Sequence, residues 1–126
     1  MAKVLGVGGV FFKAQDLAET KAWYARVLGV EAGEHGAMFP PLPPKGMTLW
    51  SPFPADTDYF EPSSAPVMIN LFVEDLDGVL ARVRAEGVEV LGTQDQPYGR
   101  FAWIMDPTGL KLELWEAAAE PEPTSA

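Results

Sequence analysis

The sequence predicts an α+β domain built from two copies of a strand–helix–strands unit. The two helix patterns begin at Asp16 and Asp75, an offset of 75 − 16 = 59 residues, and one gap aligns their closing glycines. A hairpin signal, D-P-T-G at residues 106–109, lies between two apolar-rich runs near the end of the chain. Because each half alone is too small to bury its sheet face well, we expect the halves to pair.

The composition restricts the class of protein. Its 126 residues suit one domain, and a 48% hydrophobic and 21% charged content is ordinary for a globular chain. The formal charge of −9 disfavours nucleic acid and anionic membranes as partners, because both would repel the protein. The absence of cysteine excludes disulfides and thiol redox sensing, and it fits a cytoplasmic location. No apolar run approaches a membrane span, and the N-terminus carries no signal-peptide pattern.

The first predicted unit begins with a strand and a helix. Residues 4–13 have a strand pattern, and their G-x-G-G is not a nucleotide-binding motif because the strand continues instead of opening a helix. Asp16 and Glu19 form a capping-box-like start, and Gly29 supplies a left-handed stop. The sequence therefore predicts a helix between Asp16 and Gly29.

Short strands and loops complete the first unit. We expect strands at residues 30–32, 37–39 and 47–53, with the proline-rich segment 40–44 as a loop. The long loop that follows carries Tyr59 and Phe60. Loops of this length are often lids or binding loops, so the region 40–66 could close over a site.

The second predicted unit repeats this order. Residues 67–73 form a strand, Asp75 opens a helix that Gly87 closes, and residues 88–91 form the next strand. The closing hairpin follows within residues 98–116. The last ten residues, 117–126, are rich in Ala, Glu and Pro and are expected to be disordered.

The final arm of the hairpin has two different faces. Leucines at 110, 112 and 114 alternate with Lys111, Glu113 and Trp115. One face is therefore aliphatic, and the other carries a carboxylate between a lysine and an indole. We expect Glu113 to face whatever the protein binds.

Two motifs resemble the vicinal oxygen chelate superfamily, which includes glyoxalase I, bleomycin-resistance proteins, fosfomycin-resistance enzymes and extradiol dioxygenases. Residues 16–29, D-L-A-E-T-K-A-W-Y-A-R-V-L-G, resemble its first helix, and residues 105–116, M-D-P-T-G-L-K-L-E-L-W-E, resemble its last strand. The resemblance implies a single glyoxalase-like domain over residues 1–116 with two βαβββ modules, about 4–62 and 67–116. Curved mixed sheets would enclose a pocket. It also implies a homodimer, in which the modules pair either within a chain or between chains.

The resemblance also places the metal-binding positions of related enzymes on this chain. They fall on Gly9, Trp50, Met68 and Glu113, of which only Glu113 can bind a hard or borderline cation. The single histidine, His35, lies in a turn away from these positions. We therefore expect neither a bound metal nor another cofactor.

Strand alternation and the resemblance together assign residues to the pocket once Glu113 is placed on its wall. The cavity should be mostly aromatic and apolar. Its expected ligand-binding residues are Phe11, Lys13, Trp50, Met68, Asn70, Phe72, Tyr98, Phe101, Trp103 and Trp115.

Some of these assignments have alternatives. On the arm opposite Glu113, Phe101 and Trp103 face the pocket only if a bulge occurs at Gly109; otherwise Arg100 and Ala102 do. The aromatic side chains could equally be core, since aromatics on a sheet face usually pack. Glu113 itself could form an ion pair with Lys111 or Arg100.

Three functions remain open, and we favour the first. The chain could be a metal-free protein that binds a planar or cationic small molecule, as in the bleomycin-resistance branch. It could be a metal-free lyase, isomerase or epimerase, with Glu113 as the catalytic base and Lys13 or Arg100 stabilising an enolate oxygen. A metal-dependent glyoxalase-like enzyme is the third, but a homodimer would only duplicate the same poor ligands.

Overall fold

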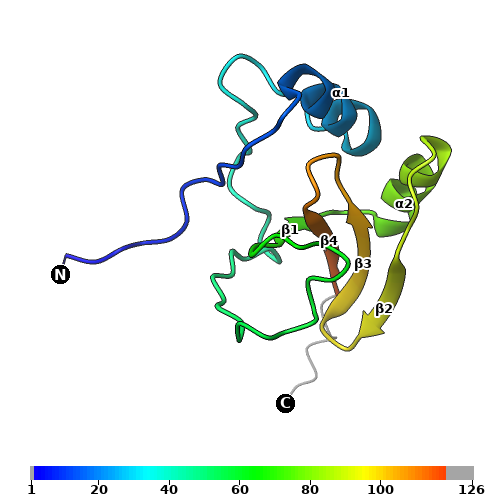
Figure 1. The fold of residues 1–126 in the computed structure, drawn as a ribbon. Coiled ribbons are helices and arrows are strands. Elements are labelled where there is room, and N and C mark those ends of the chain that lie inside the picture. Colours follow the sequence, from blue (N-terminus) through cyan, green and yellow to red (C-terminus); the bar gives the residue numbers. More distant parts are fainter. Residues whose placement is uncertain (1, 119–126) are drawn as a thin grey trace.

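One mixed, four-stranded sheet packs against two helices in the computed structural model, which describes residues 2–118 (Figure 1). The elements in chain order are α1 (Leu17–Leu28), β1 (Ile69–Phe72), α2 (Leu76–Ala85), β2 (Gly92–Gln96), β3 (Gly99–Met105) and β4 (Lys111–Ala117). The strand order is β1-β4-β3-β2, with β1 parallel to β4 and the other neighbours antiparallel. The predicted α+β class is confirmed. The sheet stays open, with β1 and β2 at its edges.

Both helices lie where the sequence predicts them. The Asp16 carboxylate caps α1 by accepting from the Glu19 N–H at 3.0 Å, and Asp75 caps α2 by accepting from the Gly78 N–H at 3.1 Å. Gly29 ends α1 with a φ of 71°, a conformation that strains other residues. Within residues 2–118, neither helix has the length and apolar character needed to cross a bilayer.

The helices cover one face of the sheet, and the core lies between the helices and that face. Alternation along β4 turns Leu112 and Leu114 toward the helices and leaves the side chains between them on the other face. The buried core residues are Trp23, Val27, Leu76, Leu80, Val83, Ala102, Ile104, Leu112 and Leu114.

The strands predicted for the first half are not formed in this single chain. Residues 4–13, 30–32, 37–39 and 47–53 join no sheet, and within residues 2–118 the only bridge outside the named strands joins Gly33 and Gly36. Figure 1 shows residues 4–13 as part of an extended arm that runs to the start of α1 without joining the sheet. The physical reason is that a strand pattern favours an extended backbone but needs a neighbouring strand to satisfy its hydrogen bonds.

Two predicted boundaries in the second half are shifted. The strand expected at 88–91 begins instead at Gly92, although Val88 and Val90 still pack on the core. The backbone N–H of Leu91 donates to Trp103 O at 2.7 Å, so this segment leads directly into the sheet. At the other end β4 continues to Ala117, and residues 119–126 of the predicted disordered tail lie outside the described residues.

A long-range hydrogen bond ties α1 to the β3–β4 turn. The Tyr24 hydroxyl donates to Asp106 Oδ2 at 2.5 Å, while Asp106 Oδ1 accepts from the backbone N–H groups of Thr108 and Leu110. Burial, and then the bond to Asp106, raise the pKa of Tyr24 above its usual range. One carboxylate therefore shapes the turn and also holds the first helix against it.

We predict that Tyr24→Phe lowers the free energy of unfolding by about 1.5–3 kcal/mol, the usual value of a hydrogen bond to a charged group. Because the folded-state pKa of Tyr24 is raised, its stabilisation is complete below about pH 10 and is lost as the pH rises further. Urea unfolding between neutral and alkaline pH measures both effects. Tyr98→Phe, at a side chain 64% exposed, should change stability by less than about 0.5 kcal/mol. Equal losses in the two variants would contradict the role given to Asp106.

Candidate functional site

Glu113 lies at the middle of the sheet face that carries no helix. It stands on β4, opposite Asn70 on β1 and Trp103 on β3. Because directly paired residues point to the same side, all three side chains share this face. The Glu113 side chain is nevertheless buried, with 8% of its surface exposed. A buried carboxylate needs partners, and this one has them.

Three side chains donate hydrogen bonds to the Glu113 carboxylate. Asn70 Nδ2 donates to Oε1 at 2.7 Å, and Trp103 Nε1 donates to Oε2 at 2.9 Å. The third donor is the hydroxyl of Tyr59, which also bonds Oε2. Both oxygens of the buried carboxylate therefore have hydrogen-bond partners within the protein.

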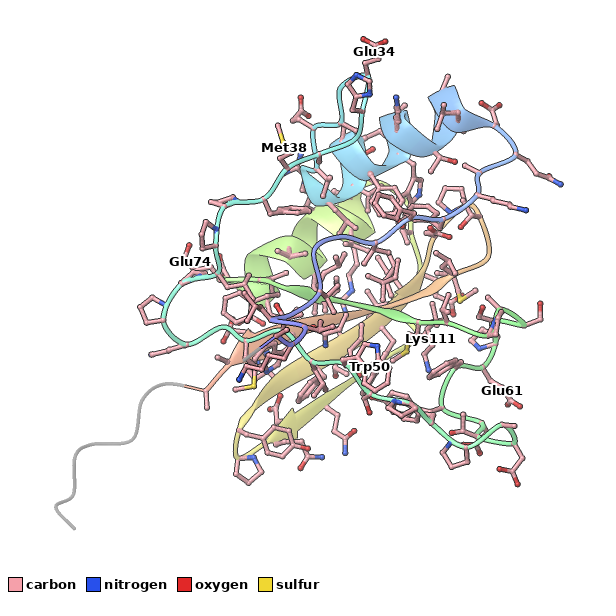
Figure 2. All side chains as sticks on the ribbon, turned by 90° about the vertical axis from the view of Figure 1, so that its left-hand side faces the viewer. Glu34, Met38, Trp50, Glu61, Glu74 and Lys111 are labelled. Atoms are coloured by element: carbon pink, nitrogen blue, oxygen red, sulfur yellow. The ribbon has the colours of Figure 1, made fainter. Side chains whose placement is uncertain are left out.

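A lysine lies close to this cluster. Lys111 Nζ donates to Tyr59 O at 2.6 Å and lies 5.1 Å from the centre of the Tyr59 ring and 5.6 Å from that of Trp103. Desolvation lowers the pKa of Lys111, and the nearby Glu113 acts in the opposite direction. Figure 2 shows Lys111 beside the loop that carries Glu61.

The Tyr59 phenol is held protonated. Burial, and then its hydrogen bond to Glu113, raise the pKa of Tyr59 above its usual range. The ring stacks on Phe53 with centroids 5.6 Å apart and meets Trp103 edge-on at 6.2 Å. Tyr59 is therefore a hydrogen-bond donor fixed on three sides.

An open cavity of about 200 Å³ lies beside this cluster. Its walls combine aromatic rings with amides and one carboxylate, a makeup common in ligand sites. The lining residues are Tyr59, Gln94, Gln96, Tyr98, Phe101, Trp103 and Glu113.

A second hollow of similar size lies at the end of β1. Its lining is mostly proline and aromatic: Phe39, Pro40, Pro41, Leu42, Pro43, Phe72 and Glu74. The proline-rich segment therefore lines this second hollow, whereas Tyr59, from the other end of the region 40–66, lines the Glu113 cavity.

The strand register places several expected pocket residues together. Trp103 pairs with Glu113 and Phe101 with Trp115, so these two aromatics share the Glu113 face and Arg100 and Ala102 do not. The connection that allows this register contains Gly109, whose φ is 92°. Asn70, Phe72 and Trp115 lie on the same face. Tyr98 lines the cavity from the β2–β3 turn.

Other expected pocket residues lie elsewhere. Phe11 and Lys13 are on the unpaired arm, and Trp50 is on another unpaired segment; Phe11 is 94% exposed and Trp50 78% exposed. None of the three lines the cavity. Met68 is half-buried and directly precedes β1. Their predicted positions depended on strands that this single chain does not form.

Arg100 requires a correction. It was expected beside Glu113 as a catalytic residue, but alternation along β3 places it on the opposite face. Its guanidinium pairs there with Asp77 at 2.9 Å and with Asp95 at 3.3 Å. Arg100 therefore joins β3 to α2 and β2 and does not reach the cavity.

Three cavity residues were not predicted from the sequence: Gln94, Gln96 and, in contact with Glu113, Tyr59. The sequence marks its loop as a region to watch, but the contact to Glu113 spans 54 residues and no local pattern indicates it. The one signal in the sequence was that a buried carboxylate needs hydrogen-bond donors, but this does not say which residue supplies them.

The donors at the family's metal positions do not fit a divalent metal. Gly9 offers no side chain, the Trp50 indole nitrogen only donates, and the Met68 thioether suits soft metals. In the part of the chain that the structure describes, no three His, Cys, Asp or Glu side chains gather closely enough to hold an ion.

One family model matches most of this chain. The model of the family described as "glyoxalase-like domain" matches residues 9–115. No curated protein matches the sequence. Among solved structures, TnmS3, an antibiotic binding protein from Streptomyces sp. CB03234, is 27% identical, with a TM-score of 0.50 over 82% of this chain and 88% of the other.

Two further structures support the fold alone, since their identities are low. A glyoxylase/bleomycin resistance protein/dioxygenase domain from Frankia sp. EAN1pec is 19% identical, with a TM-score of 0.60 over 92% of this chain and all of the other. A member of the glyoxalase/bleomycin resistance protein/dioxygenase superfamily from Sphaerobacter thermophilus DSM 20745 is 22% identical, with a TM-score of 0.51 over 82% of this chain and 90% of the other.

We predict that Glu113→Gln destabilises the fold by about 1–3 kcal/mol although the side chains are nearly the same shape. The amide nitrogen cannot accept, so at least one of the three donors around residue 113 loses its partner. Urea unfolding measures the loss, and the Trp103 indole N–H resonance should move. Glu89→Gln, an exposed carboxylate on the surface, is the matched control. Equal stability of the two variants would show that the Glu113 bonds contribute little.

Proposed function

Since this chain belongs to the glyoxalase-like domain family, we propose that it binds a small molecule on the Glu113 face of its sheet. The observation that carries this proposal is the open cavity, where aromatic rings surround a single buried carboxylate. Aromatic walls supply apolar contact area, and a few polar groups fix the orientation of a ligand.

The similarity to TnmS3 supports a ligand-binding role. That protein is an antibiotic binding protein, and it resembles this chain over more than four-fifths of each sequence. A fold shared by several chemistries does not determine function by itself. The proposal therefore rests on the cavity, and the relative adds support for a small molecule as ligand.

We further propose that binding requires no metal or other cofactor. Only Glu113 among the four family metal positions is a suitable ligand, and both of its oxygens already accept hydrogen bonds from the protein. Three or four protein ligands are usual for such sites. The acidic net charge makes nucleic acid and anionic membranes poor partners, and we place the protein in the cytoplasm.

Catalysis by Glu113 is the competing proposal. A general base must reach the proton that it removes, and Glu113 borders the cavity. However, the second catalytic group proposed from the sequence, Arg100, pairs with Asp77 on the opposite face. Binding without chemistry therefore requires fewer unobserved groups.

We also propose that the protein is a homodimer. Of the seventeen large hydrophobic side chains exposed in the described residues, fourteen lie between residues 4 and 53. Exposed apolar surface on this scale is typical of an interface. The edges of the sheet are also unpaired. A second copy would cover the apolar segments and supply the neighbours that the predicted strands of the first half lack.

We predict that planar aromatic compounds raise the melting temperature. A ligand at one hundred times its Kd adds about 2.7 kcal/mol, which corresponds to a rise on the order of 10 °C for a domain of this size. Phe101→Ala should reduce the shift, whereas Phe39→Ala, in the second hollow, should not. A chelator should leave the shift unchanged. Loss of the shift in Phe39→Ala alone would move the site to the second hollow.

We predict a particle of twice the 13.7 kDa chain mass in light scattering after size-exclusion chromatography. Phe11→Asp should lower the mass toward that of a monomer, because it places a charge in the apolar surface. Val67→Asp is the control: Val67 is also exposed, but it lies outside the segment from residue 4 to residue 53 that carries most of the apolar surface. A monomer in the wild type would refute the dimer.

A further inference from the structure

The third donor to Glu113 differs from the other two because the sheet does not supply it. Asn70 and Trp103 donate from β1 and β3, whose positions are fixed by strand register. Tyr59 donates from the loop between α1 and β1. One hydrogen-bonding position of the carboxylate is therefore filled by a phenol that arrives from outside the sheet.

The cavity lies directly beside this phenol. Tyr59 forms part of its wall, and the open volume is about 200 Å³, below the roughly 300–1,000 Å³ of most small-molecule sites. Withdrawal of the Tyr59 ring would add its space to the cavity. It would also free the acceptor position on Glu113 Oε2 that the phenol now occupies.

We propose, building on the function proposed above, that Tyr59 occupies the ligand position of this site and that the ligand is a neutral hydroxyaromatic compound. The O–H of the ligand donates to Glu113 Oε2 in place of the tyrosine hydroxyl. Its ring lies where the Tyr59 ring now meets Trp103 edge-on at 6.2 Å. The protein's own side chain thus indicates the chemistry that the site accepts.

The charges around the site favour a neutral ring. Lys111 Nζ lies 5.1 Å and 5.6 Å from the Tyr59 and Trp103 ring centres, so a cationic ring in this place would exchange a favourable contact for repulsion. An anionic ring would face the Glu113 carboxylate. Asp58 and Glu61, which attract the Lys111 ammonium, lie on the Tyr59 loop. The sequence predicts a planar or cationic ligand; of these two, the charges around the site favour a planar, uncharged hydrogen-bond donor.

The loop has separate attachments to the sheet. At Tyr59 it is held by the phenol bond to Glu113 and by Lys111 Nζ, which donates to the Tyr59 carbonyl. Four residues later the Ser63 hydroxyl donates to Gly109 O. A ligand that replaces the phenol therefore removes one attachment while the Ser63 bond still holds the far end of the loop.

The test compares four probes of similar shape: 2-naphthol, naphthalene, 2-naphthoate and 2-naphthyltrimethylammonium. Binding to the full-length protein at pH 7 is followed through the Trp103 indole N–H resonance and by calorimetry. We expect 2-naphthol to bind about tenfold more tightly than each of the other three, because only the neutral donor satisfies Glu113.

Variants of Tyr59 test whether this side chain occupies the ligand position or only lines the cavity. Tyr59→Phe removes the hydroxyl that competes with the ligand for Glu113. We expect 2-naphthol to bind this variant roughly tenfold more tightly than it binds the wild type, because no Tyr59–Glu113 hydrogen bond has to break first. Tyr59→Ala should strengthen binding at least as much. Tyr24→Phe is the matched control, because it also removes a phenol bonded to a carboxylate, but on the other side of the sheet. It should leave the affinity for 2-naphthol unchanged.

Several results would overturn the inference. If 2-naphthol binds Tyr59→Phe more weakly than it binds the wild type, the tyrosine hydroxyl contacts the ligand and does not occupy its position. Tighter binding of a charged probe, or equal binding of naphthalene, would refute the ligand class while leaving a small-molecule site in place. If no probe binds to the wild type or to Tyr59→Ala, both the inference and the proposed function fail.

Discussion

The position of β4 in the middle of the sheet is the constraint on which the rest of the structure depends. It is the only strand with β1 on one side and β3 on the other, so its register decides what those strands present on each face. Its leucines at 112 and 114 face the helices and are fully buried, which fixes Glu113 between them on the opposite face. A shift of one residue would exchange the two sets and place the carboxylate in the core.

Features with local causes could be predicted from the sequence. The helix caps at Asp16 and Asp75 lie where the capping patterns indicate, and alternation along β1 and β4 puts Asn70 and Glu113 on one face, as the sequence predicts. The choice between the two faces of β3 could not be made from sequence, because it depends on the register with which β3 pairs with β4 across the turn between them. The prediction of strands in the first half was wrong for a related reason: a strand pattern contains no information about whether a neighbouring strand is available to pair with it.

The site combines a predictable half and an unpredictable half. Glu113 and its donor Asn70 follow from periodicity. Trp103 depends on the register of β3, and Tyr59 reaches Glu113 through a loop whose path no local pattern describes. Glu113 therefore accepts hydrogen bonds at both of its carboxylate oxygens, with the Lys111 ammonium nearby. Acceptors of this kind discriminate between donors by direction as well as by charge.

The bond between Tyr24 and Asp106 has a consequence for the order of folding. It joins residues 82 apart in sequence, whereas the β3–β4 hairpin pairs residues close along the chain. Closing the longer loop costs more chain entropy, so the local hairpin can form before the first helix finds its place. Asp106 already organises the turn through the N–H groups of Thr108 and Leu110. Its carboxylate is therefore oriented to accept the Tyr24 hydroxyl as soon as the hairpin has formed. The second half of the chain thereby acts as the template on which α1 docks.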